Sequence, residues 1–96
     1  MKSRAKFRFR LYVAAQAQNS EHALGNLNAL CRAHLPGRFE IEVVDVYRHP
    51  GRALADGILM TPTLLKLEPA PVRRIVGSLG QTQIVLRALG LEPAST

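Results

Sequence analysis

The sequence predicts an α/β fold in which a strand, a helix and a parallel strand precede a strand hairpin and a last helix. Apolar and polar residues alternate over residues 7–13, and apolar residues recur every three or four positions over residues 19–35. Residues 39–46 alternate at first and become wholly apolar around Val43 and Val44. A strand, a helix and a strand of these lengths form a right-handed crossover with parallel strands.

The ends of these first elements follow from particular residue types. The first strand is expected to turn four apolar side chains toward the core, those of Phe7, Phe9, Leu11 and Val13. Asn19 and Ser20 are good candidates for the N-cap of the helix, because their short polar side chains can accept hydrogen bonds from its first backbone N–H groups. Pro36 and Gly37 are expected to end it.

The C-terminal half begins with a short helix that Pro50 opens and Gly57 closes. Strands over residues 63–67 and 72–76 flank a proline-containing break and predict a hairpin, and residues 81–91 have a helix-like distribution of apolar residues that starts near Ser78. The simplest arrangement of this half is therefore ββα.

Periodicity does not fix this half as firmly as the first. Residues 52–60 and 78–91 mix small and β-branched residues, and both stretches could be helix or strand in different surroundings. The arrangement of the C-terminal half therefore stays open at this point.

Composition limits the classes of protein to consider. The 96 residues are expected to form one domain spanning residues 1–96, with a modest core. No apolar run approaches the roughly 20 residues that span a bilayer, and the basic N-terminus lacks the apolar block of a signal peptide. A single cysteine allows no intrachain disulfide, so we expect a cytoplasmic protein.

The net charge of +6 raises the question of nucleic-acid binding. The basic residues gather at the N-terminus and at Arg73 and Arg74, and no helix-turn-helix, zinc-finger or ribonucleoprotein motif accompanies them. A basic surface for protein contacts or solubility explains them better, and we expect neither a nucleic acid nor a membrane as partner.

No constellation for catalysis or metal binding is visible. The three histidines are scattered, and His22 and His34 are separated by more than three turns of one helix. Asp45 and Asp56 form no recognisable acid–base pair, and there is no nucleophile elbow or glycine-rich phosphate loop. The sequence predicts a non-catalytic protein without a cofactor or metal.

The Thr61-Pro62-Thr63 step marks the entrance of a strand. Proline is tolerated at the first position of a strand, and this is a place where a cis peptide bond is most plausible. In the thioredoxin-like superfamily a cis proline directly precedes a central strand, and this segment resembles it. A thioredoxin also carries Cys-x-x-Cys at the start of its first helix, whereas residues 14–20 contain no cysteine. Cys31 lies on the apolar face of the helix and is expected to be a core residue.

A more specific resemblance covers nearly the whole chain. The block Ile58-Leu59-Met60-Thr61-Pro62-Thr63-Leu64, followed by Pro71-Val72-Arg73-Arg74-Ile75-Val76-Gly77, resembles the KaiB family. The runs over residues 11–14, 43–46 and 85–89 resemble it too, with nearly ungapped spacing. The sensor domain of the clock kinase SasA is a related family with a thioredoxin-like fold.

This resemblance implies a non-catalytic protein that binds the N-terminal ATPase ring of a KaiC-like hexameric ATPase. It also implies two folds: a ground state, commonly tetrameric, and a thioredoxin-like monomer that binds KaiC. We therefore expect a homo-oligomer, dimer or tetramer, with a C-terminal half in either the ββα or the ground-state arrangement. Two alternatives remain: a sensor module acting on a histidine kinase, and a thioredoxin-fold protein that binds a thiol ligand.

Candidate site residues follow from the same resemblance. Partner contacts are assigned to Arg73, Arg74, Lys66, Glu40 and Glu42. Glu40 and Glu42 replace Ala and Lys of the family at an edge that serves KaiA, which counts against KaiA as a partner. Gly57 replaces a lysine that is a partner contact in the family. The residues assigned to the fold switch are Pro62, Pro71, Gly77, Ala88 and Gly90.

Overall fold

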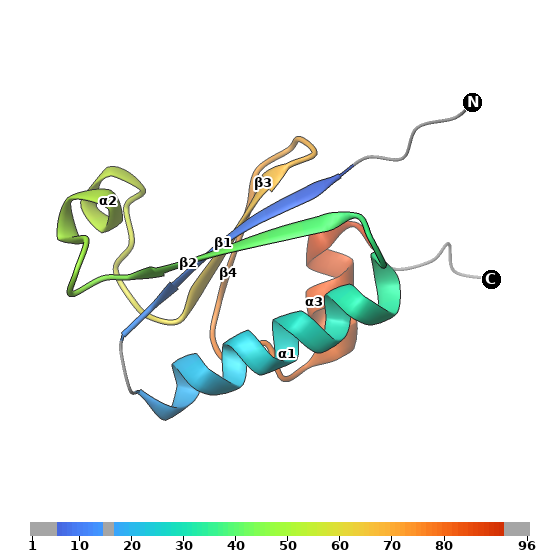
Figure 1. Ribbon diagram of the computed structural model, residues 1–96, viewed down its shortest axis with the longest axis horizontal. Helices are drawn as coiled ribbons and strands as arrows, with labels where there is room; N and C mark the ends of the chain where they lie inside the picture. Colours follow the sequence, from blue (N-terminus) through green and yellow to red (C-terminus); the bar gives the residue numbers. More distant parts are fainter. Residues whose placement is uncertain (1–5, 15–16, 92–96) are drawn as a thin grey trace.

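The protein folds into a mixed four-stranded sheet with helices on both faces (Figure 1). A computed structural model describes residues 6–14 and 17–91. In these ranges the elements are β1 (Phe7–Val13), α1 (Gln18–His34), β2 (Phe39–Asp45), α2 (Pro50–Ala55), β3 (Thr63–Glu68), β4 (Arg73–Val76) and α3 (Thr82–Leu89). Every element expected from the sequence is present, in the expected order.

The strands lie in the order β2-β1-β3-β4. β1 and β2 are parallel, as the crossover through α1 requires, whereas β3 is antiparallel to both β1 and β4. The C-terminal half therefore has the ββα arrangement, one of the two that the sequence left open. β2 and β4 form the two edges of the sheet.

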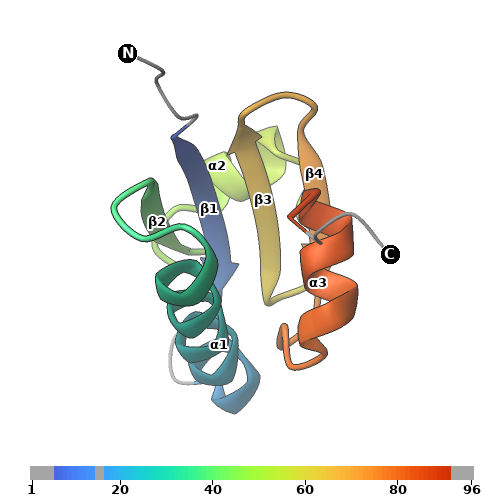
Figure 2. The same cartoon turned by 90° about the vertical axis from the view of Figure 1, so that its right-hand side faces the viewer.

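The larger core lies on the face of the sheet that α1 and α3 cover (Figure 2). Phe9 and Leu11 of β1 are buried there against Leu27 of α1 and Leu86 of α3. These side chains recur every second residue in the strand and along one stripe of each helix, so that each element turns its apolar side inward.

A second, smaller core lies on the other face, under α2. Tyr12 and Val44 are buried against Ala53 of α2 and Leu65 of β3. The alternation in β1 predicted burial only for side chains on the same face of the strand as Phe9. Tyr12 lies on the opposite face and is nevertheless fully buried. The reason is that α2 returns over this end of the sheet, which periodicity within β1 cannot show.

The start of α1 differs from the expectation. Ala17 is the N-cap residue and makes no side-chain cap hydrogen bond, so the prediction of Asn19 or Ser20 as N-cap was wrong. Ser20 lies inside the first turn, where its buried hydroxyl accepts a hydrogen bond of 3.1 Å from the backbone N–H of Ala14. Ser20 thus ties the helix to the end of β1. Ala15 and Gln16 of the loop expected here lie outside the described residues.

α3 is shorter than the expected helix over residues 81–91. It ends at Leu89, and Gly90 follows as the C-cap with a left-handed φ of 76°. Glycine adopts this conformation without steric cost and is the residue that most often closes a helix in this way. Gly90 therefore stabilises the end of α3 from outside the helix.

Candidate interaction surfaces

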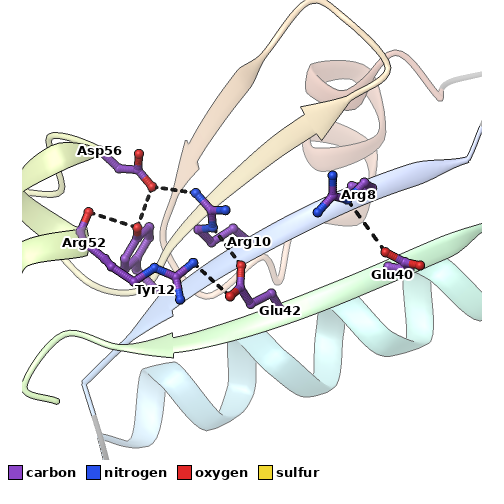
Figure 3. Close-up of polar contacts among 7 residues, drawn as sticks. All are labelled: Arg8, Arg10, Tyr12, Glu40, Glu42, Arg52 and Asp56. Carbon is purple, nitrogen blue, oxygen red and sulfur yellow. Dashed lines mark hydrogen bonds and ion pairs between the residues drawn. The ribbon is translucent and has the colours of Figure 1, made fainter. Parts of the chain in front are cut away.

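The face of the sheet opposite α1 and α3 carries paired charges between β1 and β2 (Figure 3). Arg8 lies opposite Glu40 in the register of the two strands, with 3.7 Å between Nε and Oε1. Arg10 lies opposite Glu42, and its Nε donates a hydrogen bond of 2.9 Å to Oε1. Lys6 also contacts Glu40, at 2.7 Å. Both expected contact residues of β2 are therefore already paired within the chain.

Asp56, just after α2, is the centre of a tighter network on the same face. Its Oδ2 accepts a hydrogen bond of 3.0 Å from Nη1 of Arg10 and one of 2.5 Å from the hydroxyl of Tyr12. The Tyr12 hydroxyl also lies 3.1 Å from the carbonyl oxygen of Arg52, whose guanidinium contacts Glu42 at 2.8 Å. These contacts join α2 to both β1 and β2.

The network perturbs the groups that form it. The Tyr12 hydrogen bond, with help from Arg10, holds the pKa of Asp56 below its ordinary value. Burial, reinforced by the hydrogen bond to Asp56, raises the pKa of Tyr12. Hydrogen bonds from Arg10 and Arg52 likewise lower the pKa of Glu42. The folded protein therefore favours a charged Asp56 beside a neutral Tyr12.

Arg74 of β4 holds the connection between α2 and β3. Its guanidinium donates hydrogen bonds of 2.6 Å to the carbonyl oxygen of Asp56 and of 3.1 Å to that of Gly57. Gly57 has a φ of 68°, which glycine adopts far more readily than a residue with a side chain. Glycine at this position thus matches the backbone conformation here.

An apolar surface surrounds this connection. Leu59 is 94% exposed and Met60 is 63% exposed, which is unusual for side chains of their size. They line a cavity of about 180 Å³ together with Ala53 of α2. Leu54, next to Ala53, and Tyr47, in the turn after β2, are also largely exposed. We call Tyr47, Leu54, Leu59 and Met60 the loop surface.

Lys66 and Arg73 are register partners with opposite environments. Lys66 is only 4% exposed, its Nζ donates a hydrogen bond of 2.8 Å to the carbonyl oxygen of Pro69, and it lies 5.9 Å from the centre of the Phe7 ring. Burial lowers the pKa of Lys66, and the nearby Arg73 adds to this effect. Arg73 is exposed. Lys66 thus supports the β3–β4 hairpin from within and is not placed as a surface contact.

The residues assigned to a fold switch occupy backbone junctions. The peptide bonds before Pro62 and Pro71 are cis, as is that before Pro69, and Pro62 is buried at the entrance of β3. Gly77 has a φ of 122°, and its N–H donates a hydrogen bond of 2.9 Å to the carbonyl oxygen of Pro62. Ala88 lies in the last turn of α3, before Gly90. Their part in a switch stays a prediction.

Cys31 lies fully buried in the larger core, as expected. Burial raises its pKa to about 12, so its thiol is very rarely ionised at neutral pH. Within residues 6–14 and 17–91, no three His, Cys, Asp or Glu side chains gather as a metal site would require. No helix in these ranges is long and apolar enough to cross a membrane.

Known structures define the fold class as thioredoxin-like. Chloroplastic thioredoxin z matches with a TM-score of 0.74 at 20% identity, over 92% of this chain and 80% of that one. The N-terminal domain of SasA from Synechococcus elongatus matches with a TM-score of 0.71 at 17% identity, over 100% of this chain and 94% of that one. At these identities the likeness concerns the fold alone.

Sequence relationship places the chain within that class. The family model described as the KaiB domain matches residues 10–91. The circadian clock oscillator protein KaiB of Thermostichus vulcanus is 42% identical over 88 residues, which are 92% of this chain and 82% of the relative. The circadian clock protein KaiB3 of Synechocystis sp. is 36% identical over 84 residues, 88% of this chain and 82% of the relative. The chain belongs to the KaiB family.

The residues that hold α2 in place were not predicted from the sequence. Arg10 and Tyr12 lie at the polar positions of an alternating strand. A large aromatic residue at such a position was the signal in the sequence that this face of the sheet is covered as well. Leu59 and Met60 were part of the KaiB-like block but were not singled out, although two large apolar residues in a loop are a signal of binding. The five assigned contact residues are not brought together: they lie on β2, inside the hairpin and along β4.

Proposed function

We propose that this KaiB-family protein is a non-catalytic clock or regulatory protein that binds the N-terminal ATPase ring of a KaiC-like hexameric ATPase. Binding would modulate the phosphorylation or ATPase cycle of that partner. The family match over residues 10–91 carries the proposal, and the similar relatives are named circadian clock proteins.

The loop surface is the part of the structure that suits such a partner best. Its four large side chains are exposed. They come from α2 and from the segments on either side of it, and α2 lies at one end of the sheet (Figure 1). Large exposed apolar groups are costly to leave in water and mark interaction sites. Arg74 supports this surface by fixing the backbone beneath it, and Arg73 is proposed as a charged contact further along β4.

The experiment mixes the full chain with the KaiC-like ATPase of its own host. The mass of the free chain is measured first, because a homo-oligomer is expected, and then complex mass and ATPase rate are followed for hours. We expect a stable complex and a changed ATPase rate. Absence of any complex over that time would contradict the proposal.

A matched pair of variants tests the surface itself. Leu59→Ser should weaken the complex at least tenfold without altering the unfolding midpoint, because the side chain is almost wholly exposed in the free protein. Val43→Ser changes a half-exposed valine on the β2 edge and should leave the complex unchanged. Equal effects of both variants would remove the loop surface from the proposal.

A sensor module that acts on a histidine kinase is the second candidate. The likeness to the N-terminal domain of SasA favours it, because it covers the whole of this chain. The KaiB relatives are far more similar in sequence, so the ATPase is the first choice. Binding to a host histidine kinase, with no binding to the ATPase, would reverse this order.

KaiA is a weak candidate on structural grounds. Glu40 and Glu42 replace the family's Ala and Lys, and both are occupied by cations of this chain. A surface complementary to a family lysine would meet carboxylates instead. We therefore propose a function that does not depend on KaiA.

A further inference from the structure

β4 is an open edge of the sheet. It pairs with β3 on one side, and the described residues supply no strand on the other. The Gly77 N–H donates a hydrogen bond to the carbonyl oxygen of Pro62, just before β3. In an antiparallel pair, only every second residue of a strand bonds to the neighbouring strand. The backbone groups of Val76 and Arg74 therefore point away from β3. Such an edge can accept a further strand.

α3 runs beside this edge (Figure 2). Residues of both elements line two cavities. One cavity of about 350 Å³ lies where β4 begins and α3 ends, and its charged lining consists of Lys66, Arg73, Arg74 and Arg87. The other, of about 270 Å³, lies where β4 ends and α3 begins, and its apolar lining includes Ile75, Val76, Ile84 and Val85. We call the β4 edge with these two cavities the β4 groove.

The two ends of the β4 groove differ in chemistry. No acidic residue lines the basic cavity, and Arg73 forms no ion pair with the described residues. At the other end, Val76 is 51% exposed and Ile84 is 57% exposed. A ligand that follows the groove would thus meet cations first and then apolar side chains.

We propose that the β4 groove binds an extended acidic segment of a partner protein, which adds to the sheet as a fifth strand. The backbone of the segment would bond to the free groups of Arg74 and Val76, as in other cases of strand addition. Its carboxylates would lie near Arg73, and its apolar side chains near Ile84. Arg73 is exposed at this end of the groove and forms no ion pair with the described residues, so an acidic segment is the complementary choice.

A second copy of the chain fits the groove less well. β4 of a second copy carries Arg73 and Arg74 and no acidic residue, so it offers no charge complementary to the basic end of the groove. The acidic side chains of β2, on the other edge, are already paired with cations of their own chain. The occupant is therefore a segment of another protein.

The proposal gives the charged contact already proposed for Arg73 a specific ligand, and in this respect it rests on the proposed function. Its test needs no ATPase, so the two can fail separately. The probe is a labelled eight-residue peptide with Glu in one half and Val in the other, made in both orders and added to the ¹⁵N-labelled full chain. We expect saturable binding, with the largest chemical-shift changes and new exchange protection at the amides of Arg74 and Val76.

Two control peptides separate strand addition from simple charge attraction. A peptide with N-methyl groups on alternate backbone nitrogens keeps its charge but cannot complete the ladder, and it should bind at least tenfold more weakly. A peptide with Lys in place of Glu should not bind. Equal binding of the N-methylated peptide would overturn the proposal without requiring any protein variant.

Matched protein variants locate the site. Arg73→Glu should weaken binding at least tenfold, whereas Arg32→Glu, an equal charge change on the exposed side of α1, should have little effect. Equal weakening by both, or the largest shifts at the β2 edge, would overturn the proposal. So would self-association through β4 in the absence of peptide, because it would make a second copy the occupant.

Discussion

The Tyr12 hydroxyl donates a hydrogen bond of 2.5 Å to the carboxylate of Asp56 and so joins the centre of the sheet to the end of α2. The same carboxylate oxygen accepts from Arg10, and the backbone carbonyl of Asp56 accepts from Arg74. One residue thus connects α2 with two strands that are distant in sequence. The loop surface beside it depends on these connections for its position.

We expect Asp56→Asn to destabilise the protein by about 1–2 kcal/mol. The amide can still accept from Tyr12, but its uncharged group loses the ion pair with Arg10. The free energy of unfolding, measured by urea denaturation, checks this. Glu21→Gln removes an exposed carboxylate in the first turn of α1 and serves as the control, with a change within about 0.5 kcal/mol. Equal losses for the two variants would contradict the role of Asp56.

The contribution of Asp56 should depend on pH in one direction. Its pKa is lower in the folded state than the ordinary value of 3.8, mainly because of the Tyr12 hydrogen bond. Its stabilisation is therefore complete above pH 3.8 and is lost as pH falls through the lower, folded value. The stability difference between the wild type and Asp56→Asn should be constant from about pH 5 to 8 and shrink below about pH 4. A difference that grows in acid would contradict this linkage.

Arg74→Gln should loosen the connection between α2 and β3. The two carbonyl oxygens of Asp56 and Gly57 lose a charged donor, at a cost of about 1 kcal/mol. Hydrogen exchange at the Ile58 amide, which donates to the Ala53 carbonyl oxygen, should become about fivefold faster. Arg48→Gln, in the exposed turn after β2, should leave this exchange unchanged. Unchanged exchange in Arg74→Gln would show that the guanidinium does not hold the loop.

The N-terminal half could be predicted because its signals are local. Alternation over residues 7–13 and the apolar stripe of α1 are set by the geometry of a strand and a helix. The start of α1 escaped because Ser20 bonds to Ala14, at the end of a different element. The burial of Tyr12 escaped because its cover, α2, lies about 40 residues away in sequence.

The candidate site could be predicted only in part, for the same reason. Resemblance pointed to the C-terminal half and to Arg73 and Arg74, but it could not show that Arg74 bonds to backbone carbonyls. Nor could it show that Lys66 lies inside the hairpin, because a lysine in a strand is ordinarily solvated. Such assignments require the register between strands, which cannot be read from the sequence.

Charge reversal should affect the free energy of unfolding much more at Lys66 than at its register partner Arg73. Lys66→Glu buries a carboxylate and leaves the Pro69 carbonyl oxygen without its donor, so we expect a loss of roughly 2 kcal/mol or more in unfolding free energy. Arg73→Glu alters an exposed side chain and should change stability by less than about 0.5 kcal/mol. Urea denaturation of both variants checks this. Equal stability losses would contradict the different environments of the two side chains.

Cys31 should be unreactive in the folded protein. With a pKa of about 12, about one thiol in ten thousand is ionised at pH 8, and the side chain is wholly buried. A disulfide reagent added at pH 8 should therefore react at least a thousandfold more slowly with the native chain than with the chain in urea. The urea sample is the control, because it contains the same thiol without the core around it. Rapid reaction in the native state would instead support a thiol ligand or redox role, since it would require Cys31 to be both accessible and readily ionised.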